Sequence, residues 1–138
     1  MKIKITIVRG NVSVVASLDD KAAPTVVKTF VEKLPLKSQL FHARWCGNEI
    51  WTPIGEVINY QGENQTIFPS IGEILIVPAG KDKCNLGIWY GKGWCFGPEG
   101  YLPGSVVGKI ETDMTEFAKA ANDVLLKGAD EILIEKYD

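Results

Sequence analysis

The sequence has little of what a metal centre or a disulfide framework requires. It contains one histidine and three cysteines in 138 residues, and no cysteine pair has the spacing of a zinc-binding or redox motif. A zinc site closed by protein ligands needs four such side chains, usually in closely spaced pairs, and an odd cysteine count favours free thiols. We therefore expect no metal and no cofactor, and we expect the cysteines to be small buried residues.

An excess of charge of one sign and long apolar runs are also missing. The net charge is -2, and the lysines are interspersed with acidic residues. A nucleic-acid partner would require a basic patch, and a membrane span would require about 20 consecutive apolar residues. The first residues do not follow the pattern of a signal peptide. We therefore expect a cytoplasmic protein that binds neither nucleic acid nor membranes.

The periodicity of apolar residues identifies the first elements. Residues 2–8 and 12–18 alternate apolar and polar side chains, and Gly10-Asn11 between them suits a tight hairpin turn. Pro24 suits the first turn of a helix, and Pro35 ends one. The spacing between these prolines is that of one apolar helix face, formed by Ala23, Val26, Val27, Phe30, Val31 and Leu34.

The remainder of the chain reads mainly as short strands between turn residues. Between residues 39 and 111, glycine and proline separate the expected strands Leu40–Trp45, Ile50–Ile54, Glu73–Val77, Leu86–Tyr90 and Val106–Glu111. A second helix should begin at Asp113, with Glu116 completing a capping box, and end at Gly128. Residues 131–137 close the chain as a strand.

This order of elements predicts a single domain over residues 1–138 that is mostly β. A closed barrel removes exposed strand edges, and a helix near each end of the chain would cover one of its two open mouths. We therefore expect a β-barrel with two helices, and a flat α+β sandwich is the alternative.

Specific motifs carry a family resemblance that spans most of the chain. The motifs are His42-Ala43-Arg44-Trp45, Trp51-x-Pro53, Glu63-Asn64-x-Thr66, Pro69-Ser70-x-Gly72-Glu73-Ile74-Leu75 and Pro78-x-Gly80. They resemble a family of short bacterial and archaeal cyclophilin-like proteins of unknown function. That family is distantly similar to cyclophilins and to the cyclophilin-like domain of cucumopine synthase. The resemblance implies a cyclophilin-like closed barrel with its functional cleft around residues 41–51, and it leaves the activity open.

The chain departs from true cyclophilins at the motif that resembles their catalytic strand. In those isomerases an arginine directly follows the histidine, whereas here Ala43 lies between His42 and Arg44. Side chains alternate across a strand, so His42 and Arg44 should share one face while Ala43 lies on the other. The Gln-Gly-Gly segment of cyclophilins is also missing, and Gln61-Gly62 continues with Glu63. Both differences argue against proline isomerisation.

Three residues are candidates for catalysis. His42 is the only histidine, Arg44 offers a rigid fork of donors for a carboxylate, and Glu63 lies in the polar loop 59–66. Each has an ordinary structural alternative. His42 could be a hydrogen-bonded strand residue, Arg44 could pair with Glu49 across a turn, and Glu63 could be a solvated loop carboxylate.

Ligand-binding candidates are mostly aromatic, because each such side chain offers a large apolar face and one polar group. They are Trp45, Trp51, Asn64, Tyr90 and Trp94. The alternative for the aromatic residues is core packing. Trp94 lies in the glycine-rich segment 91–97, which we interpret as a loop that lines a pocket or forms a homodimer contact.

The leading functional hypothesis is a protein that binds a small molecule, and the sequence does not decide whether it is an enzyme. If it is one, it would act on a small carboxylate, an imine or a cyclic amide by acid/base chemistry, as the likeness to the cucumopine synthase domain implies. The first alternative is a peptidyl-prolyl cis-trans isomerase or a binder of proline peptides. The second is a non-catalytic dimeric module.

Overall fold

The alternating residues near the N-terminus form the first antiparallel pair of strands. The computed structural model describes the whole chain, residues 1–138, and β1 (Lys2–Ile7) pairs with β2 (Val12–Leu18). Ile7 lies opposite Val12, so residues 8–11 form the connection and the expected two-residue turn is wrong. Asn11 has a φ of 51°, in the left-handed region that asparagine enters more readily than most residues.

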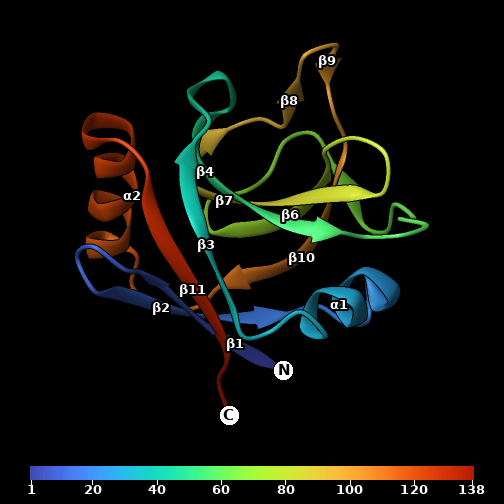
Figure 1. Ribbon diagram of the computed structural model, residues 1–138, viewed down its shortest axis with the longest axis horizontal. Coiled ribbons are helices and arrows are strands. Elements are labelled where there is room, and N and C mark those ends of the chain that lie inside the picture. The colour runs from blue at the N-terminus through green and yellow to red at the C-terminus, as the bar shows by residue number, and fades with distance from the viewer.

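Eight strands close into an antiparallel barrel, which confirms the cyclophilin-like closed barrel expected from the sequence (Figure 1). The order is β2-β1-β11-β3-β4-β7-β6-β10, and pairing of β2 with β10 closes the ring. The strands after β2 are β3 (Leu36–His42), β4 (Gly47–Glu56), β6 (Glu73–Pro78), β7 (Lys83–Gly93), β10 (Gly104–Ile110) and β11 (Asp130–Lys136). The short β5 (Gln65–Thr66) adds to β10, while β8 (Phe96–Gly97) and β9 (Gly100–Tyr101) form a separate hairpin.

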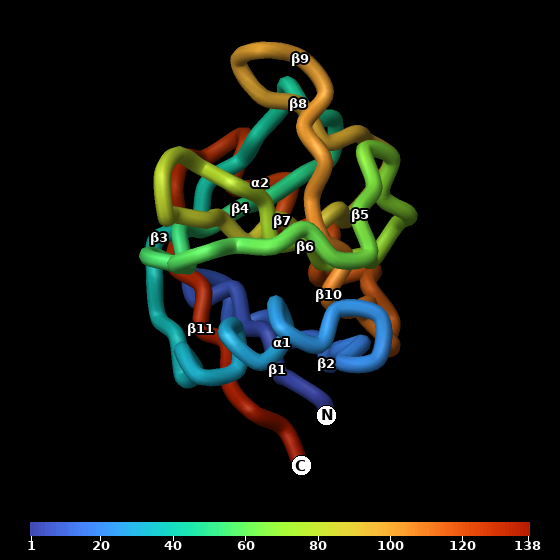
Figure 2. Tube along the Cα trace, turned by 90° about the vertical axis from the view of Figure 1, so that its right-hand side faces the viewer, coloured from blue at the N-terminus to red at the C-terminus, as the bar shows by residue number.

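Two helices lie at opposite sides of the barrel, α1 (Pro24–Val31) facing the viewer and α2 (Thr115–Lys127) behind in Figure 2. Their apolar faces extend the barrel core: Phe30 of α1 and Phe117 of α2 are each 1% exposed. Burying a side chain of this size contributes roughly 1.5–3 kcal/mol. The α+β sandwich is therefore excluded, and the barrel interior is packed with side chains at both ends.

The ends of α2 match the sequence signals only in part. Asp113 Oδ1 accepts a hydrogen bond from the backbone N–H of Thr115 (2.7 Å), and Gly128 follows the helix with a φ of 95°. Glu116 pairs with Lys119 (3.2 Å), so the second half of the expected capping box is wrong. Neither α1 nor α2 has the length and apolar composition that a membrane-crossing helix needs.

A second, smaller core lies on the outer face of the barrel. Strand β7 directs Leu86, Ile88 and Tyr90 inward, so Gly87 and Trp89 face outward by alternation. Trp89 is nonetheless completely buried, because Ala43 and Cys46 on one side and Cys95 on the other pack against it. Its partners in this outer core are Ala43, Cys46, Leu75 and Cys95.

Two segments differ from the sequence prediction, and both border this outer core. Strand β3 ends at His42, and Arg44–Cys46 forms a short 3-10 helix that leads into β4, so the strand predicted to Trp45 is wrong. The backbone bends at Ala43 (φ -112°, ψ 74°), and its N–H donates to Glu49 O at 2.9 Å. The segment 91–97 is not one loop, because β7 continues to Gly93, which pairs with Gly47.

Candidate functional site

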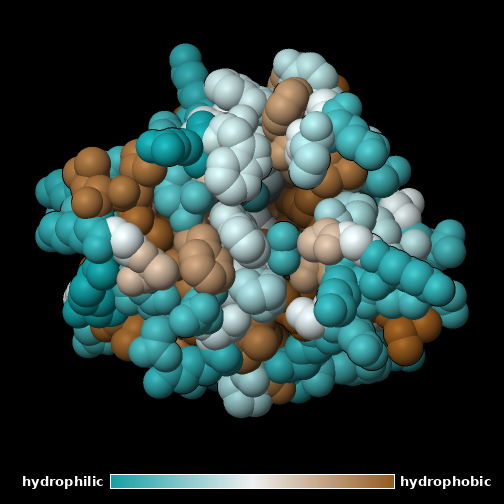
Figure 3. Space-filling model, turned by 45° about the horizontal axis from the view of Figure 1, so that its top comes forward, coloured by the Kyte–Doolittle hydropathy of each residue, from teal (hydrophilic) through white to brown (hydrophobic).

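A cavity of about 250 Å³ opens on the outer wall of the barrel, above the outer core. Its walls come from the 3-10 helix and β4 on one side, from β6 and β7 below, and from the segment 95–102 on the other side. Figure 3 views the molecule from this end, where the surface is hollowed next to apolar side chains. Nine of its 14 lining residues are hydrophobic, which is typical of a site for a small organic molecule.

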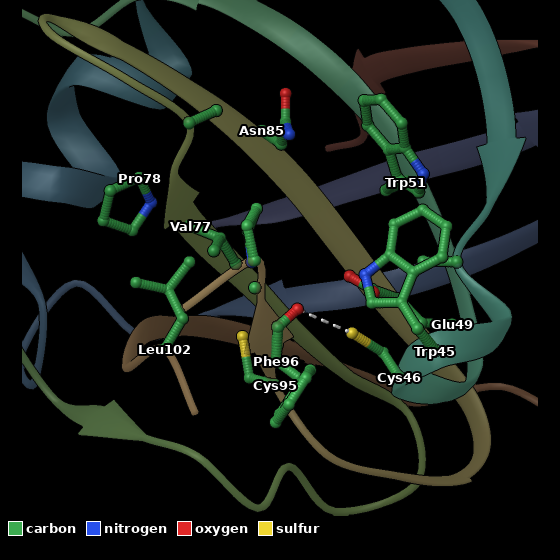
Figure 4. A pocket seen from close by; sticks show the side chains of 14 residues that line it. Trp45, Cys46, Glu49, Trp51, Val77, Pro78, Asn85, Cys95, Phe96 and Leu102 are labelled. Atoms are coloured by element: carbon green, nitrogen blue, oxygen red, sulfur yellow. Dashed lines mark hydrogen bonds between the residues drawn. The ribbon is translucent and has the colours of Figure 1, made fainter. Parts of the chain in front are cut away.

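Strand alternation turns Glu49 and Trp51 of β4 toward this cavity. Ile50 and Thr52 are fully buried inside the barrel, so their neighbours face outward, over β7. The register places Glu49 beside Trp89 and Trp51 beside Gly87. Figure 4 shows both side chains among the residues that line the cavity. Glu49 therefore projects from the outer face of the barrel, where polar residues are usual, but it is buried in the cavity wall.

The absence of a side chain at Gly87 creates the space that Glu49 occupies. A Cβ built at Gly87 would overlap Glu49 Oε2 and would lie 2.8 Å from Cζ3 of Trp89. A Cβ at Gly93 would likewise overlap the carbonyl oxygen of Cys46, which accepts a hydrogen bond from Trp89 Nε1 at 3.3 Å. Glycine inside a strand often marks such a close approach. These two glycines let the 3-10 helix and the acidic side chain pack directly on the sheet.

Burial controls the ionisation of Glu49. Glu49 is only 6% exposed, and this burial raises the pKa of its carboxyl group to about 8. A hydrogen bond with the Cys46 thiol opposes the rise. The carboxyl group is therefore mostly protonated at neutral pH and close to its midpoint. Such a group can both donate and accept a proton without a large energetic cost.

The two cysteines of the cavity wall stay neutral. Burial, together with the nearby Glu49, raises the pKa of Cys46 and of Cys95 to about 12. The Cys46 thiol donates to the carbonyl oxygen of Phe96 at 3.2 Å, shown as the dashed line in Figure 4. Thiols with such raised pKa values are poor nucleophiles. They therefore serve as packing groups around Glu49.

Aromatic side chains frame the cavity mouth. Trp51 packs against Phe41 with ring centroids 4.9 Å apart, and its Nε1–H is buried without an acceptor. Trp45 is 54% exposed, and its carbonyl oxygen accepts a hydrogen bond from Trp94 Nε1 at 2.8 Å. Trp45 and Trp51, both expected to bind ligand, therefore line the cavity. Trp94, also expected to bind ligand, is not among the lining residues and is hydrogen-bonded to the backbone beside the cavity.

The structure places His42 and Arg44 in a different hollow, at the end of the barrel under α2. His42 Nε2 shares a hydrogen bond of 2.7 Å with the hydroxyl of Tyr90 inside the barrel mouth. Burial lowers the pKa of His42, and the charge of Arg44 lowers it further. Arg44 is exposed and forms no ion pair, so the expected pairing with Glu49 is wrong.

Glu63 and Asn64 connect their loop to the rest of the fold. Glu63 Oε1 accepts hydrogen bonds from the backbone N–H groups of Thr25 and Val26, both at 2.9 Å, at the start of α1. Asn64 Nδ2 donates to the carbonyl oxygen of Val106 at 3.1 Å. The three residues predicted to be catalytic therefore do not meet in one cavity, and their catalytic role stays a prediction.

Sequence reasoning considered Glu49 only as a surface partner of Arg44. The available signal was its position one residue before Ile50, which places it on the same strand face as Trp51. What the sequence could not show is that residues from the segment 95–102 fold over that face and form the opposite wall of the cavity.

Comparison with known families and structures agrees with this fold. The family described as "Protein of unknown function (DUF3830)" matches residues 5–135. No curated protein matches the chain. Among solved structures, McbB in complex with tryptophan superimposes with a TM-score of 0.77 at 19% identity, over 97% of this chain. The chain spans only 44% of the McbB chain.

Two further structures match over nearly their full length. A hypothetical protein of Archaeoglobus fulgidus gives a TM-score of 0.68 at 18% identity, over 99% of this chain and 95% of its own. A cyclophilin-type peptidyl-prolyl cis-trans isomerase of Cryptosporidium parvum, determined in the presence of the dipeptide Ala-Pro, gives 0.67 at 16% identity, over 100% and 99%. At these identities the likeness shows a shared cyclophilin-like fold, which confirms the resemblance seen in the sequence motifs.

Proposed function

We propose that this chain, which belongs to the DUF3830 family, binds a small, largely apolar molecule in the outer-wall cavity and exchanges a proton with it through Glu49. The observation that carries the proposal is a carboxyl group, 6% exposed, on the wall of an open apolar cavity. Buried carboxyl groups with pKa values near neutrality are typical of general acids and bases.

Imines and cyclic amides are the substrate classes that suit this wall best. An imine nitrogen can accept a proton from the Glu49 carboxyl group, whose pKa is about 8, and the carbonyl oxygen of a cyclic amide can accept a hydrogen bond from it. A carboxylate substrate was also expected, on the basis of Arg44, but Arg44 does not line this cavity. The complex of McbB with tryptophan supports a flat aromatic ligand, as do the indole rings of Trp45 and Trp51.

Proline isomerisation is a weaker candidate for the same cavity. Cyclophilins carry an arginine directly after the histidine, and the corresponding residue here, Ala43, lines the cavity with a methyl group. No arginine occurs anywhere in the cavity wall. We therefore expect no activity in a standard proline-isomerisation assay on a short peptide.

A dimeric role rests on the exposed aromatic side chains near the cavity mouth. Tyr101 is 57% exposed and packs against Phe68 and Phe96, and Trp94 is 41% exposed. Contiguous exposed apolar patches can mark protein interfaces. Sizing of the wild type against Trp94→Ala separates this role from ligand binding. If both variants run as monomers, the dimeric role fails and the ligand proposal is unaffected.

A cavity-blocking variant tests the proposed function. Ala79 is exposed and lines the cavity from the end of β6, so Ala79→Trp should fill the space without disturbing the core. Ala22→Trp, in an exposed position before α1, is the matched control. Indole, 2-phenylethylamine and a cyclic amide would be titrated into each protein by NMR.

We expect shifts at Glu49 and Trp51 in the wild type and in the control, and their loss in the blocked variant. Equal binding to all three proteins, or shifts that cluster elsewhere, would contradict the proposed site. Retained folding of Ala79→Trp is checked in the same spectra by the signals of the barrel core.

A further inference from the structure

Resting on the proposed function, we infer that the ligand of the outer-wall cavity carries a basic nitrogen and no carboxylate group. The geometry behind this inference is the distribution of charge around Glu49. The chemical classes that meet both conditions are aromatic or cyclic amines, imines and related bases.

The cavity wall holds one carboxyl group and no positively charged side chain. No lysine, arginine or histidine is among its 14 lining residues, and Asn85 supplies the one side-chain amide. A carboxylate ligand would therefore lose its hydration without gaining an opposite charge, and it would lie near Glu49. Burial of an unpaired charge is strongly unfavourable, whereas a cation would find a partner.

The aromatic side chains of the cavity also favour a cationic ligand. Trp45, Trp51 and Phe96 line the cavity and present π systems whose faces attract cations. The buried Nε1–H of Trp51 has no acceptor, but it lies at the edge of that ring and leaves its face apolar. A flat base can therefore pack against the rings while its nitrogen meets the carboxyl group.

Glu49 alone should set the pH response of the site. From the elements packed against it, the titratable groups that face it are the thiols of Cys46 and Cys95, which remain neutral because their pKa values are about 12. The β6 and β7 residues that line the cavity carry no charge. An ammonium ligand binds the ionised carboxylate, so its affinity should rise toward pH 8 as Glu49 loses its proton.

Three molecules of similar size provide the test: 2-phenylethylamine, 2-phenylethanol and 3-phenylpropionate. Each would be titrated by calorimetry and NMR between about pH 6 and pH 9. The amine stays largely charged in this range, because the pKa of an alkylamine is about 10. Glu49→Gln removes the ionisable group. Glu99→Gln is the matched control, because Glu99 is an exposed carboxylate on the turn between β8 and β9.

At pH 8 we expect the amine to bind about tenfold more tightly than the alcohol, and the carboxylate to bind most weakly, since hydrogen bonds to charged groups are the stronger ones. Glu49→Gln should abolish the advantage of the amine over the alcohol, and the pH dependence of amine binding. Glu99→Gln should behave as the wild type does.

The two proposals fail in different ways. If the alcohol binds in the cavity but the amine gains nothing, or if the carboxylate binds best, the charge inference is overturned and the proposed site stands. An amine preference that survives in Glu49→Gln also overturns the inference. If none of the three molecules binds in the cavity, the proposed function fails together with it.

Discussion

Replacing Glu49 by glutamine should change how the stability of the barrel depends on pH. Burial raises the pKa of this carboxyl group from its ordinary value of 4.5 to about 8 in the folded protein. A raised pKa means that the folded state holds the proton more tightly than the unfolded chain. Its contribution to stability is therefore fully present below about pH 4.5 and is lost as the pH rises through about 8.

The magnitude follows from the size of the shift. Each pKa unit corresponds to about 1.4 kcal/mol, so between pH 5 and pH 8 the folded wild type should lose about 3 kcal/mol through this one group. That is a large share of a typical domain stability of about 5–15 kcal/mol. Glutamine has nearly the same shape and does not ionise, so Glu49→Gln should not show this loss.

Urea unfolding at several pH values provides the assay. The difference in unfolding free energy between Glu49→Gln and the wild type should grow steadily in favour of the variant from pH 5 to pH 8. Glu99→Gln, at an exposed site, should follow the wild type throughout. Parallel pH profiles for all three proteins would refute the reasoning, because they would mean that Glu49 is already ionised in the fold.

Three other substitutions test the surrounding structure. Gly87→Ala should displace the buried carboxyl group and cost about 1–3 kcal/mol in urea unfolding. Gly10→Ala, whose Cβ would meet only Val12 Cγ2 at 3.4 Å, should cost far less. Glu63→Ala should lower the unfolding free energy by about 1–2 kcal/mol, because two N–H groups at the start of α1 lose their acceptor. An unchanged unfolding free energy would contradict this structural role and favour the catalytic role predicted from the sequence. Arg44→Gln should raise the pKa of His42 in an NMR titration, and an unmoved midpoint would show that the two side chains do not interact.

The sequence contains enough information to predict the barrel. Strict alternation identifies β1 and β2, and the helical spacing that ends before Pro35 identifies α1, although the helix itself ends at Val31. These signals are local, because they depend on which face of an element is buried. The family motifs then supply the closure of the sheet, which no local pattern encodes.

The site is only partly predictable for the same physical reason. The segment around residues 41–51, expected to form the cleft, does line the cavity through Ala43, Trp45, Cys46, Glu49 and Trp51. Assigning roles within it failed at the bend after His42, where a 3-10 helix replaces the predicted strand. From there on, strand alternation no longer relates His42 to Arg44, and the two lie outside the cavity wall.

The importance of Glu49 depends on contacts between distant parts of the chain. Its burial requires the missing side chain at Gly87 and the cover provided by Cys95 and Phe96, about 40 residues away or more in sequence. The local sequence places Glu49 on the same strand face as Trp51, but it does not show that this face is covered. Its raised pKa is therefore a property of the tertiary fold.

Direct titration of the Glu49 carboxyl carbon by NMR, with and without 2-phenylethylamine, tests the central claim that this group is a proton-exchanging part of a ligand site. Without ligand the midpoint should lie at about 8, and the bound amine should lower it by favouring the ionised form. A midpoint near 4.5, or one that the amine leaves unchanged, would contradict the account.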